Sequence, residues 1–330
     1  MSMTVIALGL ATAVAYGASD FLGGFASRRS EASLAVVALL KVTTLAVFMA
    51  GMPLASVLPN VAAMTWGGLA GLTLALGYIA YFRGLAVGHM GIVSTVTAVW
   101  SAIVPLAAGL ALGERPSPLT WTGIGVIVLA IVLITYTRAS STQAVPPQSK
   151  PVKVEPQCLI HCAGAAPPAD QPLPQRPPVP AVFARPIFSR GVLEATLAGI
   201  MFATFFVALD RASAATGGQA LAWPLLASAV SAAILVCTVA VVRRVQWRAA
   251  LRQAPVVVAA GMLYAAGSWS FIFAVSRGWI SIIAVIAALS PAPTMLLARL
   301  LLAESLSARQ LLGVLLALAG IALVTAGLDR

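Results

Sequence analysis

The chain has 330 residues, of which 60% are hydrophobic and only 9% are charged. Soluble domains carry roughly 45 to 50% apolar and about 25% charged residues, so this composition excludes an ordinary soluble enzyme or binding domain. The formal net charge is +11. Most basic residues fall between apolar runs or in a proline-rich middle segment, which favours contact with anionic lipid head groups over nucleic acid.

Ten charge-poor runs approach the roughly 20 apolar residues that a membrane-spanning helix needs. In the first part of the chain they cover 4–25, 33–55, 61–84, 89–112 and 119–137. In the second part they cover 191–209, 219–242, 255–276, 278–303 and 309–327. The first run lacks a positively charged leader and exceeds the core of a signal peptide, so we expect it to be retained. We predict an all-α integral membrane protein of about ten transmembrane helices.

The two halves of the sequence align without a gap when the chain is shifted by 190 residues, and identical residues then recur at many positions. The coinciding pairs include Gly9 with Gly199, Asp20 with Asp210, Gly71 with Gly261, and Glu114 with Glu304. A single register over both halves indicates internal duplication. Each unit holds five spans, an odd number, so the second copy enters the membrane from the opposite side. The sequence therefore predicts two inverted five-helix repeats, an architecture of secondary transporters.

We divide the chain into a first repeat at 1–138, a linker at 139–188 and a second repeat at 189–330. The linker holds 12 of the 21 prolines and no apolar run long enough to span, so we predict a disordered aqueous segment. Its cluster of Cys158, His161 and Cys162 resembles part of a metal site, but one such cluster is a weak signal for four ligands. We expect no metal and no other cofactor.

The distribution of basic residues predicts the orientation. Of the 20 Lys and Arg residues, 15 lie in the linker or in loops on its side of the membrane, four lie on the other side, and Lys41 lies within a span. The positive-inside rule then places the linker in the cytoplasm and both termini outside, in a cell inner (plasma) membrane.

Three sequence segments carry a family signature. The first is 19–29 (SDFLGGFASRR), and the second is 112–116 (LGERP) followed by 121–123 (WTG). Residues 303–307 and 310–313 repeat the second segment in the other half. These segments resemble the first helix, and the signature between the fourth and fifth helices, of EamA-type transporters in the drug/metabolite transporter superfamily. The resemblance implies the fold and a transport activity but not the substrate. It also implies cytoplasmic termini, against the charge count, which we retain.

Two charged residues fall inside the first two spans. An ionised Asp20 costs about 2.5 to 3.5 kcal/mol at a helix centre and less near the interface. Lys41 lies roughly one helical turn deeper, so we hypothesise an interior ion pair; the alternative places Asp20 at head-group level beside Arg28. Asp210 matches Asp20 in the second half, whereas Ser231 replaces Lys41. Either aspartate is a candidate proton-coupling site, Asp20 before Asp210, with structural pairing as an equal alternative.

Prolines within matching spans point to a central binding site. Pro105 lies in the fourth span and Pro291 and Pro293 lie in the ninth, so we expect interrupted backbone hydrogen bonding in both. The alternative is a kink absorbed by packing. Polar and aromatic residues nearby include Tyr81, Ser101, Tyr264, Ser268 and Ser270, and such residues suit an amphipathic organic solute. The candidate substrate-binding residues are Tyr16, Asp20, Lys41, Tyr78, Trp100, Asp210, Trp269 and Ser290.

Glu114 and Glu304 end the fourth and ninth spans. A carboxylate there can accept hydrogen bonds from the start of the next helix, so we favour a structural role in the turn over substrate contact.

No nucleotide-phosphate loop, metalloprotease motif or serine elbow occurs, so the sequence predicts a gradient-driven transporter and no enzyme. We favour an exporter of a small metabolite or drug-like solute; the alternative is a non-transporting membrane receptor or scaffold. The expected partners are a small solute and membrane lipid, with a coupling proton and a second copy of the chain as further candidates, and no nucleic acid.

Overall fold

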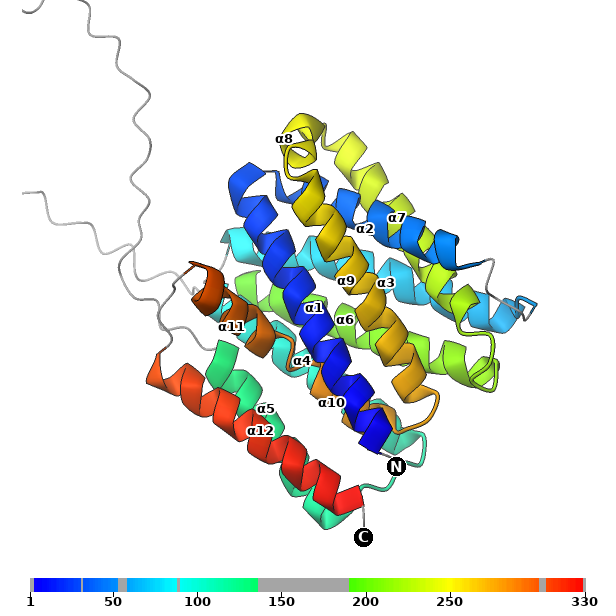
Figure 1. The fold of residues 1–330 in the computed structure, drawn as a ribbon, viewed down its shortest axis with the longest axis vertical. Helices are drawn as coiled ribbons and strands as arrows, with labels where there is room; N and C mark the ends of the chain where they lie inside the picture. The colour runs from blue at the N-terminus through cyan, green and yellow to red at the C-terminus, as the bar shows by residue number, and fades with distance from the viewer. Residues whose placement is uncertain are drawn as a thin grey trace, which may run out of the picture.

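The structure is a computed structural model that describes residues 3–30, 32–52, 58–87, 90–135, 190–302 and 307–328, which are helical and contain no strand. The first half holds α1 (Met3–Ser30), α2 (Ser33–Gly51), α3 (Val61–Val87), α4 (Met90–Ala111) and α5 (Pro118–Thr135). The second half holds α6 (Arg190–Ala215), α7 (Ala222–Val242), the short α8 (Trp247–Leu251), α9 (Ala254–Val275), α10 (Ile280–Ala287), α11 (Pro291–Leu302) and α12 (Ala308–Leu328) (Figure 1). The expected linker and its Cys158 to Cys162 cluster lie outside the described residues.

The helices confirm the predicted membrane architecture. Within the described ranges, nine helical segments are long and apolar enough to cross a membrane, with α10 and α11 together forming one of them. The apolar part of α5, Pro118–Ile134, is shorter and supplies the tenth. The prediction of an all-α membrane protein with about ten spans is therefore confirmed.

The two halves pack as interlocked inverted repeats. The contact of α3 with α6 is matched by that of α9 with α1, and the contact of α3 with α7 by that of α9 with α2. Likewise α4 packs on α6, as α10 and α11 pack on α1. The pairs α2 with α7 and α5 with α12 join corresponding helices directly, and α5 and α12 lie side by side in Figure 1. Exchanging the halves thus reproduces the same contact pattern.

Matching glycines make matching contacts between the halves. A Cβ atom added at Gly71 of α3 would collide with the carbonyl oxygen of Ser228 on α7. One added at Gly261 of α9 would lie 3.0 Å from the carbonyl oxygen of Leu40 and 2.7 Å from Cβ of Thr43 on α2. Small residues at these crossings let two backbones approach, which matters because lipid provides little hydrophobic force between helices.

The prolines act differently in the two halves. The ninth predicted span is broken, since α10 ends at Ala287 and α11 begins at Pro291 after a turn at 288–290. Two prolines within one turn, Pro291 and Pro293, remove two backbone donors. The fourth span instead runs unbroken through its single Pro105, from Met90 to Ala111. Pro105 still lacks a backbone donor, so hydrogen bonding is interrupted in both spans, but only the ninth is broken into two helices.

Replacing Gly71 by alanine is expected to weaken the contact between α3 and α7. The added methyl group meets backbone on α7, and overpacking of this kind costs about 1 to 3 kcal/mol. The matched control is Gly68→Ala one turn earlier on the same helix, where a Cβ has nothing within 4 Å. Thermal unfolding in detergent should show a lower midpoint for Gly71→Ala only; equal midpoints for both variants would contradict the packing argument.

Candidate functional site

Lys41 of α2 is buried among aromatic rings. Its side chain is 1% exposed, and its Nζ atom makes no hydrogen bond to the part of the chain that the structure describes. Nζ lies 3.4 Å from the ring centroid of Tyr264 on α9 and 4.8 Å from that of Tyr78 on α3. Cations over ring faces at such distances are attracted by the ring quadrupole. Aromatic faces from two helices thus surround this buried amine.

Asp20 of α1 acts electrostatically on Lys41, but the two residues do not form the hypothesised direct ion pair. Their charges attract one another, and the charge of Asp20 also acts on the hydroxyl groups of Tyr16, Tyr78 and Tyr264. Nζ of Lys41 has no hydrogen-bonding partner among the described residues, and it lies on the tyrosine rings. Asp20 thus lies within electrostatic range of Lys41, and the hypothesised direct ion pair is absent between these two described residues.

Asp20 is exposed although it lies on the inward face of α1. Helical periodicity places it on the same face as Ala13 and Tyr16, both buried, and away from the exposed Val14 on the outer face. Gly24 follows Asp20 by one turn; it is also exposed, and a Cβ there would have nothing within 4 Å. We infer that the carboxylate borders an opening inside the bundle, which continues toward the C-terminal end of α1.

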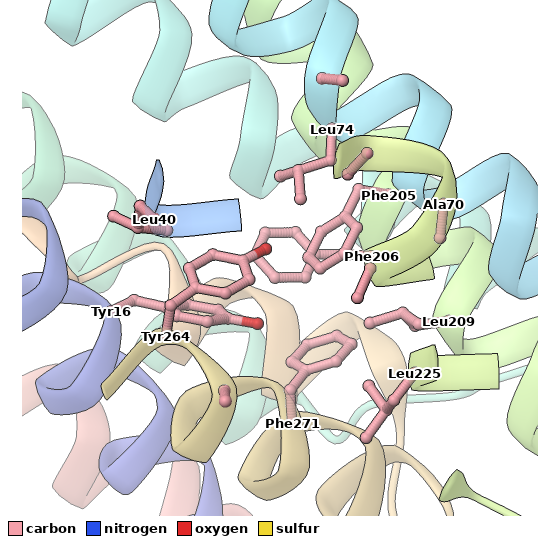
Figure 2. Close-up of a cluster of buried hydrophobic side chains, with 14 of the residues drawn as sticks. Tyr16, Leu40, Ala70, Leu74, Phe205, Phe206, Leu209, Leu225, Tyr264 and Phe271 are labelled. Carbon is pink, nitrogen blue, oxygen red and sulfur yellow. The ribbon is translucent and has the colours of Figure 1, made fainter. Parts of the chain in front are cut away.

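Tyrosines on three helices surround this region. Tyr78 and Tyr81 of α3 both interact with the charge of Asp20, and both rings contact Phe202 of α6, with centroids 5.2 and 6.3 Å away. On the other side, the rings of Tyr16 and Tyr264 stack with centroids 5.1 Å apart (Figure 2). The site therefore combines one reachable carboxylate with several aromatic faces.

The hydroxyl groups of the stacked tyrosines have unequal partners. The hydroxyl of Tyr16 lies 3.2 Å from Oγ of Ser268, at hydrogen-bonding distance. The hydroxyl of Tyr264 is buried and finds no hydrogen-bonding partner within the described ranges. Figure 2 shows both hydroxyls directed to the same side of the stack. The hydroxyls of Tyr16, Tyr264 and Ser268 therefore lie together in one buried polar cluster.

The break between α10 and α11 lies directly against α1. A Cβ at Gly17 would collide with the carbonyl oxygen of Ser290 and approach Cβ of Pro293 to 2.8 Å. The hydroxyl of Thr294 donates to the carbonyl oxygen of Gly17 at 2.8 Å and is also 3.0 Å from that of Ser290. Ser290 thus lies at the broken helix, against Gly17 of α1. Gly17 precedes Asp20 by three residues.

The remaining candidates lie elsewhere. The carboxylate of Asp210 on α6 accepts from Nη2 and Nε of its neighbour Arg211 at 2.6 and 3.0 Å. Trp269 packs against Phe48 of α2 and Phe273, and Trp100 lies at the crossing of α4 with α6. The structure thus brings together Tyr16, Asp20, Lys41 and Tyr78, with Ser290 near α1, but not Asp210, Trp100 or Trp269.

Five residues of this region were not among the eight sequence candidates. Tyr81, Tyr264 and Ser268 were named only among the polar residues near the prolines, and nothing in the sequence distinguishes them. Gly17 and Phe202 carry no polar signal. Their roles depend on contacts between α1 and α11 and between α3 and α6, which periodicity alone does not show.

Glu114 caps α10 of the opposite half. Its Oε1 accepts from the backbone N–H of Ile280 at 2.8 Å and its Oε2 from that of Ser281 at 3.0 Å. The first amides of a helix have no partner within it, and a carboxylate there also meets the positive end of the helix dipole. The expected structural role is thus supported, but the capped helix is α10 and not the following α5. Glu304 lies outside the described residues.

Two inverted repeats, about ten spans and an interior polar site beside a broken helix are features of transport proteins. The model of the EamA-like transporter family matches residues 3–136 and 189–326, and the chain therefore belongs to this family of membrane transporters. A solved structure entitled "Crystal structure of protein" is 17% identical, covers 96% of each chain and has a TM-score of 0.62, which shows a shared fold. No curated protein matches.

Removing the carboxylate of Glu114 is expected to destabilise the protein. Glu114→Ala leaves two amides of the buried α10 without acceptors, and the loss of charge-assisted hydrogen bonds of this kind costs about 1 to 3 kcal/mol. The control is Glu194→Ala, whose carboxylate lies 3.8 Å from the exposed Arg83 and should contribute little. Thermal unfolding should separate the two variants, and equal stability would contradict the capping role.

Proposed function

We propose that this protein is a secondary active transporter of the plasma membrane that exports a small metabolite or drug-like solute by alternating access of its two inverted repeats. The observation that carries the proposal is the exposed carboxylate of Asp20 on the inward face of a membrane-spanning helix. A charged group within a span, facing a polar interior, is typical of a substrate or ion pathway. Energy then comes from an ion or solute gradient, with Asp20 as the candidate proton-coupling group.

The difference between the two aspartates supports alternating access. Asp20 faces an opening, whereas Asp210 is 8% exposed and is held by Arg211. Because the repeats are inverted, these equivalent residues lie toward opposite faces of the membrane. Glu114 also links the two halves on the side of Asp210, and the two carboxylates interact there. An opening on one side and a closed contact on the other are what one conformation of an alternating-access cycle requires.

The side of the opening supports export. The opening continues toward the C-terminal end of α1, which lies on the same side of the membrane as the linker. The distribution of basic residues places that side in the cytoplasm. A resting site that faces the cytoplasm can load a solute there for release outside.

A membrane receptor or scaffold remains the alternative, because the same tyrosine cluster can bind a solute without moving it. Within the described residues, however, the break between α10 and α11 lies against α1, and a discontinuous helix at a binding site is typical of transporters. This contact favours transport over static binding.

Reconstituted protein should carry out saturable flux of at least one solute from a broad panel when a pH or solute gradient is imposed on proteoliposomes. Asp20→Asn is expected to lower that flux at least tenfold, because it removes the reachable charge. Glu194→Gln removes an equal charge from a carboxylate that lies 3.8 Å from the exposed Arg83, and it should retain flux within about twofold of wild type. Saturable binding without flux for every solute would instead indicate a receptor.

Native cysteines test the orientation. Cys158 and Cys162 lie in the predicted linker, and the third cysteine, Cys237, lies within α7 and is removed by Cys237→Ser. A membrane-impermeant maleimide should label the linker cysteines in inside-out vesicles and not in intact cells. Labelling in intact cells would place the linker outside and reverse the expected direction of transport.

A further inference from the structure

We propose that the solute carries an organic ammonium group, that Asp20 binds this group beside Tyr78 and Tyr81 of α3, and that Lys41 is a built-in counter-ion which the solute replaces. This inference rests on the proposed transport function and names the substrate class of the same site. The inference depends on three observations: a solute can reach Asp20, it cannot reach Lys41, and tyrosine rings line the region between these two residues.

The reachable charge is negative. Asp20 is exposed on the inward face of α1, and Gly24 one turn away leaves open space beside it. Lys41 is 1% exposed, and the ring of Tyr264 lies 3.4 Å from its Nζ atom. A solute that enters beside Gly24 therefore meets the carboxylate first, while the amine stays behind aromatic rings. This order favours a cationic group over an anionic one.

The aromatic surroundings fit the same class of solute. Tyr78 and Tyr81 of α3 both lie within electrostatic range of Asp20, and Phe202 of α6 extends this wall. Ring faces attract ammonium groups, and they also pack against an apolar or aromatic body. A carboxylate beside several ring faces is a suitable arrangement for an amine with a hydrophobic substituent. An anionic solute of the same shape would be repelled by Asp20.

Lys41 stabilises the empty site without filling it. Its charge attracts that of Asp20, yet the two groups make no direct contact, so the carboxylate keeps its hydrogen-bonding positions free for a ligand. The second half shows the contrast, because Asp210 is bound directly by Arg211 at 2.6 Å and the position that matches Lys41 is Ser231. A direct pair occupies its carboxylate, whereas the distant pair around Asp20 does not.

A solute ammonium and Lys41 then compete for one carboxylate. When the solute binds, its ammonium group neutralises the carboxylate of Asp20 in place of Lys41. The amine of Lys41 stays on the ring faces of Tyr264 and Tyr78. Removal of Lys41 should therefore strengthen binding of the solute. A lysine with a purely structural role would give the opposite result, since its loss would disturb the site.

The experiment compares three probes with the same ring and chain: 2-phenylethylammonium, 2-phenylethanol and 3-phenylpropanoate. Binding to purified full-length protein in nanodiscs is measured by titration calorimetry. Wild type is expected to bind the ammonium probe at least tenfold more tightly than either analogue. Asp20→Asn should abolish this preference, and Glu194→Gln, the charge-matched control, should retain it. A preference for the anion, or equal binding of all three probes, would overturn the proposed substrate class.

Two variants test the counter-ion. Lys41→Met should tighten binding of the ammonium probe several-fold. Tyr264→Leu removes the ring beneath the amine and frees Lys41 to pair with Asp20, so it should weaken binding several-fold, and adding Lys41→Met should reverse that loss. Weaker binding in Lys41→Met, or a Tyr264→Leu loss that persists in the double variant, would overturn the counter-ion role. If Lys41→Met does not fold, the Tyr264→Leu result decides alone: weaker binding supports the counter-ion role, and unchanged or tighter binding overturns it.

Flux in proteoliposomes separates this inference from the proposed function. Selective binding of the ammonium probe without flux would retain the substrate class and reject transport. Saturable flux of 3-phenylpropanoate or 2-phenylethanol, with no binding of the ammonium probe, would retain transport and overturn the substrate class.

Discussion

The close approach of helix backbones at glycines is the constraint on which the rest of this structure depends. Lipid is as apolar as a leucine side chain, so helices gain little by burying apolar surface against one another. Gly71 and Gly261 instead bring α3 onto α7 and α9 onto α2 in equivalent ways. Gly17 brings α1 onto the turn between α10 and α11. The matching position in the other half is Val207, so the packing of α4 on α6 lacks this glycine.

An asymmetric site has thus been built on a symmetric frame. The two aspartates occupy matching positions, but their surroundings differ, most of all in the charged residue that faces each one. Arg211 follows Asp210 directly and forms an ion pair with its carboxylate. Asp20 is followed by Phe21, and its positive counter-charge is Lys41 on a neighbouring helix. A counter-charge held by another helix leaves the carboxylate free and makes its surroundings sensitive to how α2 and α1 are placed. Duplication therefore supplies the scaffold, and the unmatched residues supply the site.

The sequence allows the spans, the inverted repeats and the proximity of Asp20 to Lys41 to be predicted, because these depend on hydrophobic length, a fixed offset and one tight turn. It does not show that tyrosines from α3 and α9 take up the amine of Lys41, since that depends on helices far apart in the chain. The same limit applies to Glu114, whose acceptors serve α10 of the other half. Pro105 shows a further limit, because one proline bends a helix that neighbours can keep intact, whereas two within a turn break it.

The position of the closed contact follows from the energetics of an exposed charge inside a membrane. Asp20 is exposed on the inward face of α1, and an ionised carboxylate within a span is tolerable only where water reaches it. Hydration must stop before the opposite face, or the membrane would leak. The eight residues of α10 are all buried, and Glu114 fixes the start of this helix to the other half. Because α11 contacts α1 at Gly17, the broken helix links the end that Glu114 caps to the helix that carries Asp20.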